Sequence, residues 1–78
     1  MVLDALAETL YSVAIAYDAS NNPEYVGEAI LGSSKADAVW RIKRITYDAS
    51  NNPTFVAWAS GTSDFDKIWN DHTGYTYS

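Results

Sequence analysis

Large and small side chains alternate over residues 11–17, and the large ones share one parity: Tyr11, Val13, Ile15 and Tyr17. Because successive side chains of a strand point to opposite faces, this pattern predicts a strand with one crowded face. The turn-forming run Asp18–Pro23 follows, and a second apolar-rich run leads to Ala29. Two such runs around a polar turn predict a β-hairpin.

The hairpin pattern occurs twice, at an offset of 30 residues. Ile15–Pro23 recurs as Ile45–Pro53 with eight of nine positions identical, and Tyr75–Tyr77 stands where a third copy would begin. A repeat of this length indicates one supersecondary unit used more than once. We therefore expect a single domain over residues 1–78, made of two repeats (about 4–33 and 34–62) and a truncated third (63–78).

Three stretches carry apolar residues at helical spacing: Leu3, Leu6 and Leu10; Ala36, Val39 and Trp40; Phe65, Ile68 and Trp69. Ser34 and Ser63 stand where N-caps of the second and third helices would lie. The pattern predicts the order α-ββ-α-ββ-α-β. This is a β-rich α+β fold, a five-stranded antiparallel sheet with three short helices on one face.

The alternation changes parity within residues 40–47. Trp40 and Ile42 share one parity, whereas Ile45 and Tyr47 share the other. A regular strand would place Lys43 beside Ile45 on the crowded face. We therefore expect a helix-to-strand junction with a β-bulge at Lys43–Arg44.

We expect six apolar residues to form the structural core: Trp40, Trp69, Phe65, Ile68, Ile15 and Ile45. The two turns are expected to depend on four polar residues: Asp18, Asn22, Asp48 and Asn52. Neither turn contains glycine, although a tight reversal between strands requires a residue with positive φ. Asn tolerates this conformation, so Asn22 and Asn52, or the Asn before each, should adopt it.

The chain carries five Lys and Arg against ten Asp and Glu, a net charge of −5. This balance argues against binding to nucleic acid or to an anionic membrane surface. The chain has no cysteine, so it forms neither disulfides nor thiolate metal sites. No apolar run approaches the roughly 18 residues of a membrane span, and the start lacks the basic segment of a signal peptide. We expect a small acidic domain made in the cytoplasm.

Asp18, Ser20 and Asn22 have the spacing that opens a calcium-binding EF-hand loop, as do their equivalents in the second repeat. Such a loop needs Gly at its sixth position and a bidentate Glu at its twelfth. Here Pro23 and Ala29 occupy those positions. Hydrogen-bonded hairpin turns therefore explain these residues better than a metal site.

The remaining chemistry-bearing residues assemble no recognisable catalytic group. His72, the only histidine, has no nucleophile or second metal ligand at a known spacing. Asp64 and Asp66 suit the start of a predicted helix, and Asp71 follows it. The basic cluster 41–44 is explained either as a solvated strand edge or as a patch that forms salt bridges to the acidic turns. We expect no enzymatic activity, no cofactor and no bound metal.

Aromatic residues are abundant: three Trp, six Tyr and two Phe. Because short helices cover only one face of a sheet, the other face is either an unusually apolar surface or a partner interface, and we expect the interface. The candidate interface residues are Trp58, Val56, Tyr75 and Tyr77. The truncated third repeat, 73–78, should pair either within its own sheet or with a neighbouring chain.

Two resemblances emerge from these residues. Tyr47–Thr54 resembles the Tyr-Asp hairpin repeats of Rhs-type proteins, of the form Tyr-Asp-x-x-Gly-Asn-x-Thr, which implies only a hairpin. Trp40–Asp48, Trp58–Gly61, Phe65–Asp71 and Tyr75–Tyr77 resemble a family of small uncharacterised, virion-associated proteins encoded in tailed-phage genomes. Their pattern is roughly Trp-x-Ile-x-Lys-x-x-Tyr-Asp, Trp-Ala-x-Gly, Phe-Asp-x-Ile-Trp-Asp and Tyr-x-Tyr.

The second resemblance implies a protein of the virion, made in the host cytoplasm. We expect a non-enzymatic structural or assembly protein of the head, neck, tail or decoration of the particle. Its partners would be itself, as a homo-oligomer, and other phage structural proteins. The alternative is a small acidic phage-encoded inhibitor of a host protein, which would need its carboxylates on one face. A hydrolase is the weakest interpretation, since no nucleophile–base pair is assembled.

Overall fold

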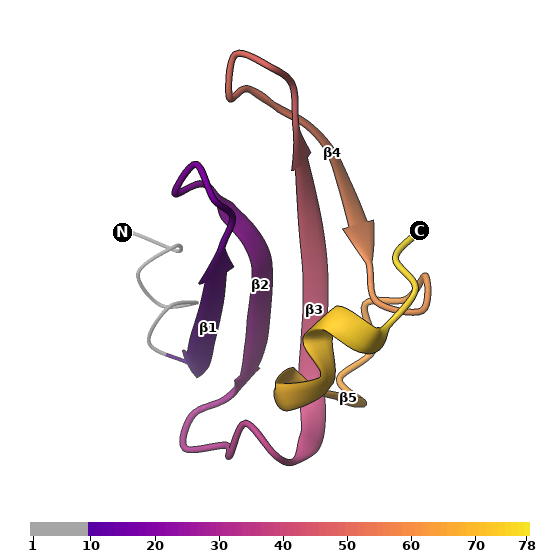
Figure 1. Ribbon diagram of the computed structural model, residues 1–78. Helices are drawn as coiled ribbons and strands as arrows, with labels where there is room; N and C mark the ends of the chain where they lie inside the picture. The colour runs from indigo at the N-terminus through magenta and orange to yellow at the C-terminus, as the bar shows by residue number, and fades with distance from the viewer. Residues whose placement is uncertain (1–9) are drawn as a thin grey trace, which may run out of the picture.

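The computed structural model describes residues 10–78 as a twisted antiparallel sheet with one short 3-10 helix (Figure 1). The elements are β1 (Tyr11–Tyr17), β2 (Pro23–Ile30), β3 (Ala38–Tyr47), β4 (Pro53–Trp58), β5 (Lys67–Ile68) and the helix η1 (Trp69–Gly74). Strands β1 to β4 form a meander in sequence order, and β5 pairs with the beginning of β3. In Figure 1, η1 crosses in front of β3 and covers one face of the sheet.

The prediction of a five-stranded antiparallel sheet is confirmed, but the fifth strand is β5 and not the segment around Tyr75–Tyr77. The prediction of repeated helices is wrong within the described residues. Val39 and Trp40 lie in β3, and Ile68 lies in β5. The predicted helix around Leu3 and Leu6 falls outside the described residues.

The helices predicted within residues 10–78 do not form, and the reason is physical. A helix of two turns is costly to nucleate and needs packing to persist. Ser34 does accept a hydrogen bond from the Ala36 amide through its hydroxyl, at 3.2 Å, as an N-cap would. Only a single turn follows, closed by the Asp37 amide and the Ser34 carbonyl (3.1 Å). The chain then extends into a strand, which gives Trp40 and Ile42 a fully buried face.

The two hairpin turns are near-identical copies. In the first, the Asp18 carboxylate accepts hydrogen bonds from the Ser20 and Asn22 amides, both at 2.9 Å. In the second, the Asp48 carboxylate accepts the corresponding bonds from Ser50 and Asn52, also at 2.9 Å. The positive φ expected at one Asn of each turn is confirmed at both equivalent positions, Asn21 and Asn51 (φ 63° each).

The hydrogen bonds of the second turn also shift the pKa of its aspartate. The hydrogen bond from the Asn52 amide, supported by that from Ser50, holds the pKa of Asp48 below its ordinary value. Each hairpin has a register shift at the same place, between Ala16 and Tyr17 and between Thr46 and Tyr47. The repeat in the sequence is therefore a repeat of hairpin geometry.

The bulge predicted at Lys43–Arg44 is absent, because β3 runs through this point in regular register. Lys43 pairs with Val26 on one side and Trp58 on the other, and Arg44 pairs with Tyr25 and Ala57. Lys43 therefore lies on the same face as Ile45. The change of parity has another cause: β3 contributes apolar residues to one face near its start and to the opposite face near its end.

The buried core lies on one face of the sheet, which we call the core face. It contains six residues that pack together: Ala14, Ala29, Trp40, Ile42, Ala59 and Trp69. The sheet contributes mostly small residues there, so the indole of Trp69 lies directly on the backbone of Gly27. A Cβ atom added at Gly27 would lie only 2.6 Å from Cε3 of Trp69. Trp40 packs beside it, with ring centroids 6.1 Å apart.

We predict that Gly27→Ala destabilises the fold, because the added methyl group forces the buried Trp69 ring off the sheet. The expected loss of unfolding free energy is about 1–3 kcal/mol, measured by denaturant unfolding. Gly74→Ala is the matched control, since an added Cβ there meets no atom within 4 Å. Equal stability of the two variants would contradict this placement of Trp69.

Candidate interaction surface

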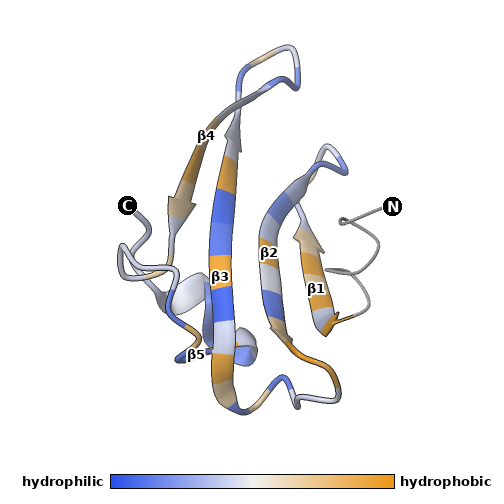
Figure 2. Cartoon of the chain, turned by 180° about the vertical axis from the view of Figure 1, so that it is seen from behind, coloured by the Kyte–Doolittle hydropathy of each residue, from blue (hydrophilic) through white to orange (hydrophobic). Residues whose placement is uncertain are grey.

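The face of the sheet opposite Trp69 is not covered by any described element; we call it the open face. It carries the odd-numbered residues of β1 and β3 and the even-numbered residues of β2 and β4, as the pairing registers require. Figure 2 views the molecule from this side, with η1 behind the sheet. Several large apolar side chains remain exposed on it, among them Val13 (49%), Ile15 (45%) and Val56 (49%).

The centre of the open face is charged, and the charges are packed against aromatic rings. Arg41 forms an ion pair with Glu28 (2.8 Å), its cross-strand neighbour. The Arg41 guanidinium lies 4.7 Å from the ring centroid of Phe65, 5.6 Å from that of Tyr11 and 5.9 Å from that of Trp58. Cation–π contacts of this kind hold a charged side chain flat on an apolar surface.

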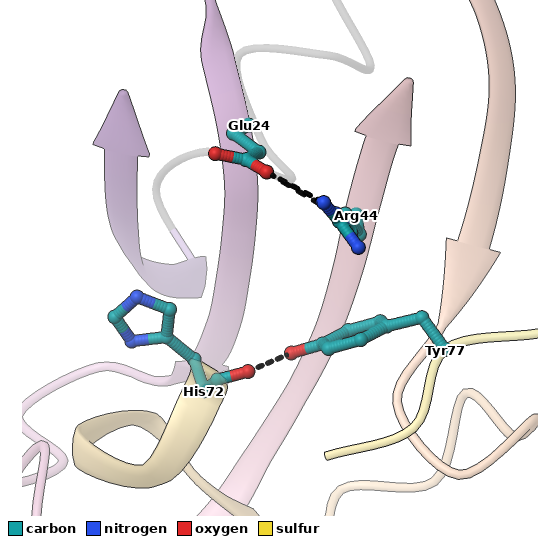
Figure 3. Close-up of polar contacts among 4 residues, drawn as sticks. All are labelled: Glu24, Arg44, His72 and Tyr77. Carbon is teal, nitrogen blue, oxygen red and sulfur yellow. Dashed lines mark hydrogen bonds and ion pairs between the residues drawn. The ribbon is translucent and has the colours of Figure 1, made fainter. Parts of the chain in front are cut away.

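The other two basic residues of the cluster, Lys43 and Arg44, also contact aromatic rings. The Lys43 ammonium lies 5.9 Å from the ring centroid of Trp58. Arg44 pairs with Glu24 at 2.9 Å (Figure 3) and lies over the ring of Tyr25. These residues were expected on a strand edge, but β3 is an inner strand between β2 and β4. Their role is to pair the carboxylates of β2 and to cover aromatic rings.

The four candidate interface residues do not share one surface. Val56 and Trp58 lie on the open face, whereas Tyr75 and Tyr77 pack against the core on the opposite face. The Tyr77 hydroxyl donates a hydrogen bond to the His72 carbonyl at 2.6 Å (Figure 3). The Tyr75 hydroxyl accepts one from the Ile68 amide at 2.9 Å. The four residues therefore do not form one continuous patch on the folded chain.

Some of the predicted core residues are buried and others are exposed. Trp40 and Trp69 are buried, Ile68 is half-buried, and Ile45 is half-buried on the open face. The assignment of Ile15 and Phe65 (42% exposed) to the core is wrong. The odd position of Ile15 in β1 places it on the open face, and the small residues of β1 turn toward the core instead. The ring of Phe65 stacks on that of Tyr11 on the same open face, with centroids 5.9 Å apart.

The structure places His72 against Trp69 of the core, and it places the acidic residues Asp64 and Asp66 in the loop before β5. The His72 ring stacks on Trp69 at 4.4 Å, and its Nδ1 lies 2.9 Å from the Trp69 carbonyl oxygen. Asp64 and Asp66 do not open a helix, contrary to expectation, because the chain there is a loop leading to β5. Asp66 instead forms an ion pair with the buried Lys67.

The C-terminal segment pairs within its own chain, which decides between the two expectations for the truncated repeat. Tyr77 forms an antiparallel bridge with Ala59. The Trp58 amide donates to the Ser78 carbonyl (3.1 Å), and the Ser60 amide donates to the Thr76 carbonyl (2.7 Å). The segment thus covers the end of β4 and brings both tyrosines onto the core face.

The described residues show no enclosed reaction site. No pocket is found in residues 10–78, and no three His, Asp or Glu side chains of this part gather at a position that could hold a metal ion. Within the same residues, no helix has the length and apolar character needed to cross a membrane. Comparison of the chain with protein-family models, curated proteins and solved structures finds no match.

We predict that deleting Gly74–Ser78 unfolds the domain, because Tyr75 and Tyr77 form part of the layer over the core. Loss of two packed tyrosines removes about 4 kcal/mol or more, a large part of the total stability of a domain this size. Circular dichroism and thermal unfolding measure the effect. Thr76→Ala is the control, since only the backbone of this exposed residue is used. A folded deletion variant would show that the segment is dispensable.

A second prediction concerns alkaline pH. Burial, together with the neighbouring Tyr25, raises the pKa of the Tyr77 hydroxyl well above its ordinary value of 10.0. The phenol therefore ionises in the unfolded chain before it ionises in the folded one. The stability that this provides is complete below about pH 10 and is lost as the pH rises further.

Tyr77→Phe should accordingly be less stable at neutral pH, by about 1 kcal/mol for the lost hydrogen bond, yet lose less stability between pH 9 and 12. Urea unfolding at stepped pH values measures both effects. Tyr17→Phe, at an exposed position, is the matched control for removing a phenol. An unchanged alkaline slope in Tyr77→Phe would refute the assignment.

Proposed function

We propose that this chain is a non-enzymatic structural protein of a tailed-phage particle and that it acts by self-association. One observation carries the proposal: the open face keeps large aliphatic side chains half-exposed while the core face holds alanines. Val13, Ile15 and Val56 are residues that proteins ordinarily bury. Exposed aliphatic side chains on an uncovered sheet face are typical of a protein–protein interface.

The ion pair at the centre of the open face is compatible with burial against another protein. The Glu28–Arg41 pair is already formed, and neighbouring rings shield the guanidinium. Covering this pair therefore leaves neither of its two charges unpaired, whereas burial of an unpaired ion is the costly case. Lys43 on the same face has no carboxylate partner among the described residues, and its ammonium contacts the Trp58 ring instead. The exposed aliphatic side chains surround the pair, and they gain most from removal of water.

The assignment to a phage particle has separate support. It comes from the resemblance of residues 40–77 to virion-associated phage proteins. Four aromatic residues of that pattern, Trp40, Trp69, Tyr75 and Tyr77, build or cover the core. The shared pattern therefore specifies a fold, and the proposed location is the virion, with other phage structural proteins as further partners.

The alternative, an acidic inhibitor of a host protein, finds no favouring observation. Such a protein would gather free carboxylates on one surface. Glu24 and Glu28 are paired with arginines, and Asp18 and Asp48 hold the turns together. These four carboxylates thus have structural roles at separate places.

Light scattering across a concentration series tests the proposal. We expect a defined oligomer whose association strengthens with salt, because each chain carries a charge of −5 and the contact is apolar. Ile15→Lys should lower the mass to that of one chain, while Ala19→Lys, at an exposed turn position, should leave it unchanged. A strict monomer, or absence of the chain from purified particles of the phage that encodes it, contradicts the proposal.

A further inference from the structure

The two edges of the sheet differ in how far they are protected. At the β4 edge, Trp58 exchanges hydrogen bonds with Ser78, at 3.1 and 3.2 Å, and the strand begins with Pro53. At the β1 edge, no segment of residues 10–78 pairs with the outer side of the strand. Residues 10–78 thus protect one edge of the sheet and leave the other free along the whole length of β1.

The direction of the main-chain groups of β1 follows from the register. The Ala59 amide donates to the Ile42 carbonyl (2.9 Å), so the polar groups of Ile42 point toward β4. Gly27 lies opposite Ile42, and its own polar groups must point away from β3, toward its partner Ala14. The even-numbered residues of β1 therefore bond inward. The inward bond from the Asp18 amide to the Asn22 carbonyl (2.9 Å) agrees with this.

It follows that the odd-numbered residues of β1 present their amides and carbonyls outward: Tyr11, Val13, Ile15 and Tyr17. Edge strands are usually protected by lysine, proline, a bulge or short length. β1 has seven residues and contains no charge and no proline. The one register shift between β1 and β2 arises from an extra residue on β2, Glu24, so β1 itself stays regular. In Figure 2, β2 and β3 carry strongly hydrophilic bands, and β1 carries none.

We infer that β1 pairs antiparallel with β1 of a second copy, across a two-fold axis at Ala14; this rests on the self-association proposed above. In this register Val13 pairs with the partner's Ile15, and Tyr11 pairs with the partner's Tyr17. All four outward-facing residues then exchange hydrogen bonds, as in β-strand addition. The two sheets become one.

Side chains on both faces fit this register. On the open face, Val13 and Ile15 meet their counterparts and extend the apolar surface across the axis. Cross-strand aliphatic and aromatic pairs of this kind stabilise a sheet. On the core face, only Ser12, Ala14 and Ala16 meet, and none is large enough to obstruct the approach. No like charges meet, because β1 carries none.

The same reasoning favours a closed dimer over a filament. A contact that uses one edge on both copies is self-complementary and closes after two chains. Head-to-tail pairing of β1 with β4 would instead propagate. It is disfavoured because Trp58 is already bonded to Ser78, which leaves only Thr54 and Val56 facing outward on β4.

Two proline substitutions separate these arrangements. Val13 and Val56 are both 49% exposed, and both direct their amides outward from an edge strand. Proline at either position therefore removes no hydrogen bond within the chain, as is generally true of outward edge positions. We expect Val13→Pro to halve the mass measured by light scattering while circular dichroism stays that of a folded sheet. Val56→Pro should remain a dimer.

A dimer that survives Val13→Pro overturns the edge pairing and leaves the proposed function standing. If Val13→Pro and Val56→Pro each dissociate the dimer, the β1–β1 pairing is overturned in favour of head-to-tail association of β1 with β4. A monomeric parent chain refutes the proposed function as well. If Val13→Pro fails to fold, amide exchange of the parent protein decides. The amides of Val13 and Ile15 should exchange slowly and that of Val56 rapidly, and rapid exchange at all three overturns the inference.

Discussion

The packing of Trp69 on Gly27 is the contact on which the rest of the structure depends. The indole occupies the volume that any other side chain at position 27 would fill, and His72 stacks on its outer surface at 4.4 Å. This contact anchors η1, and through η1 the C-terminal segment, over the sheet. Without it the meander would be a single layer, and its apolar core face would be left in water. A second layer is the minimum that a sheet requires to bury a face.

The described part of the chain covers only one face in this way. The C-terminal segment supplies the cover for the core face, and none of the described residues is left to cover the other. The consequence is an open face that combines exposed aliphatic side chains with an ion pair held among rings. Within residues 10–78, the same arrangement protects the β4 edge and leaves the β1 edge open. The proposed self-association follows from this asymmetry in how one short chain is distributed over a sheet.

The two repeats show that equivalent residues of a repeated sequence can have different environments in one sheet. Their turns match in hydrogen bonding and in φ, because each turn depends on residues within five positions of one another. Their strands do not match in environment. Tyr17 is 60% exposed on an edge strand, whereas its equivalent Tyr47 lies on an inner strand and donates a hydrogen bond to the Pro23 carbonyl at 2.7 Å. Position in the sheet, and not the repeat, decides burial.

Sequence alone determined the features that arise from local chemistry. The hairpins, their Asx-type turns and the positive φ of one Asn in each turn were all predictable from composition, parity and turn residues. The burial of Trp40 and Trp69 was also predictable from their size and spacing. The open face could have been recognised from the two-sided apolar pattern of β3, had a regular strand been assumed through Lys43.

Tertiary structure decided the remainder. The stretch containing Trp40 has helical spacing, yet it forms a strand, because only an extended chain can pair with β2, β4 and β5 at once. The position of Trp69 decided which face became the core, and it thereby moved Ile15 and Phe65 to the outside and the C-terminal tyrosines to the inside. Local patterns specify two candidate faces for every strand. The choice between them is made by a contact between residues 42 positions apart, Gly27 and Trp69, which no local pattern encodes.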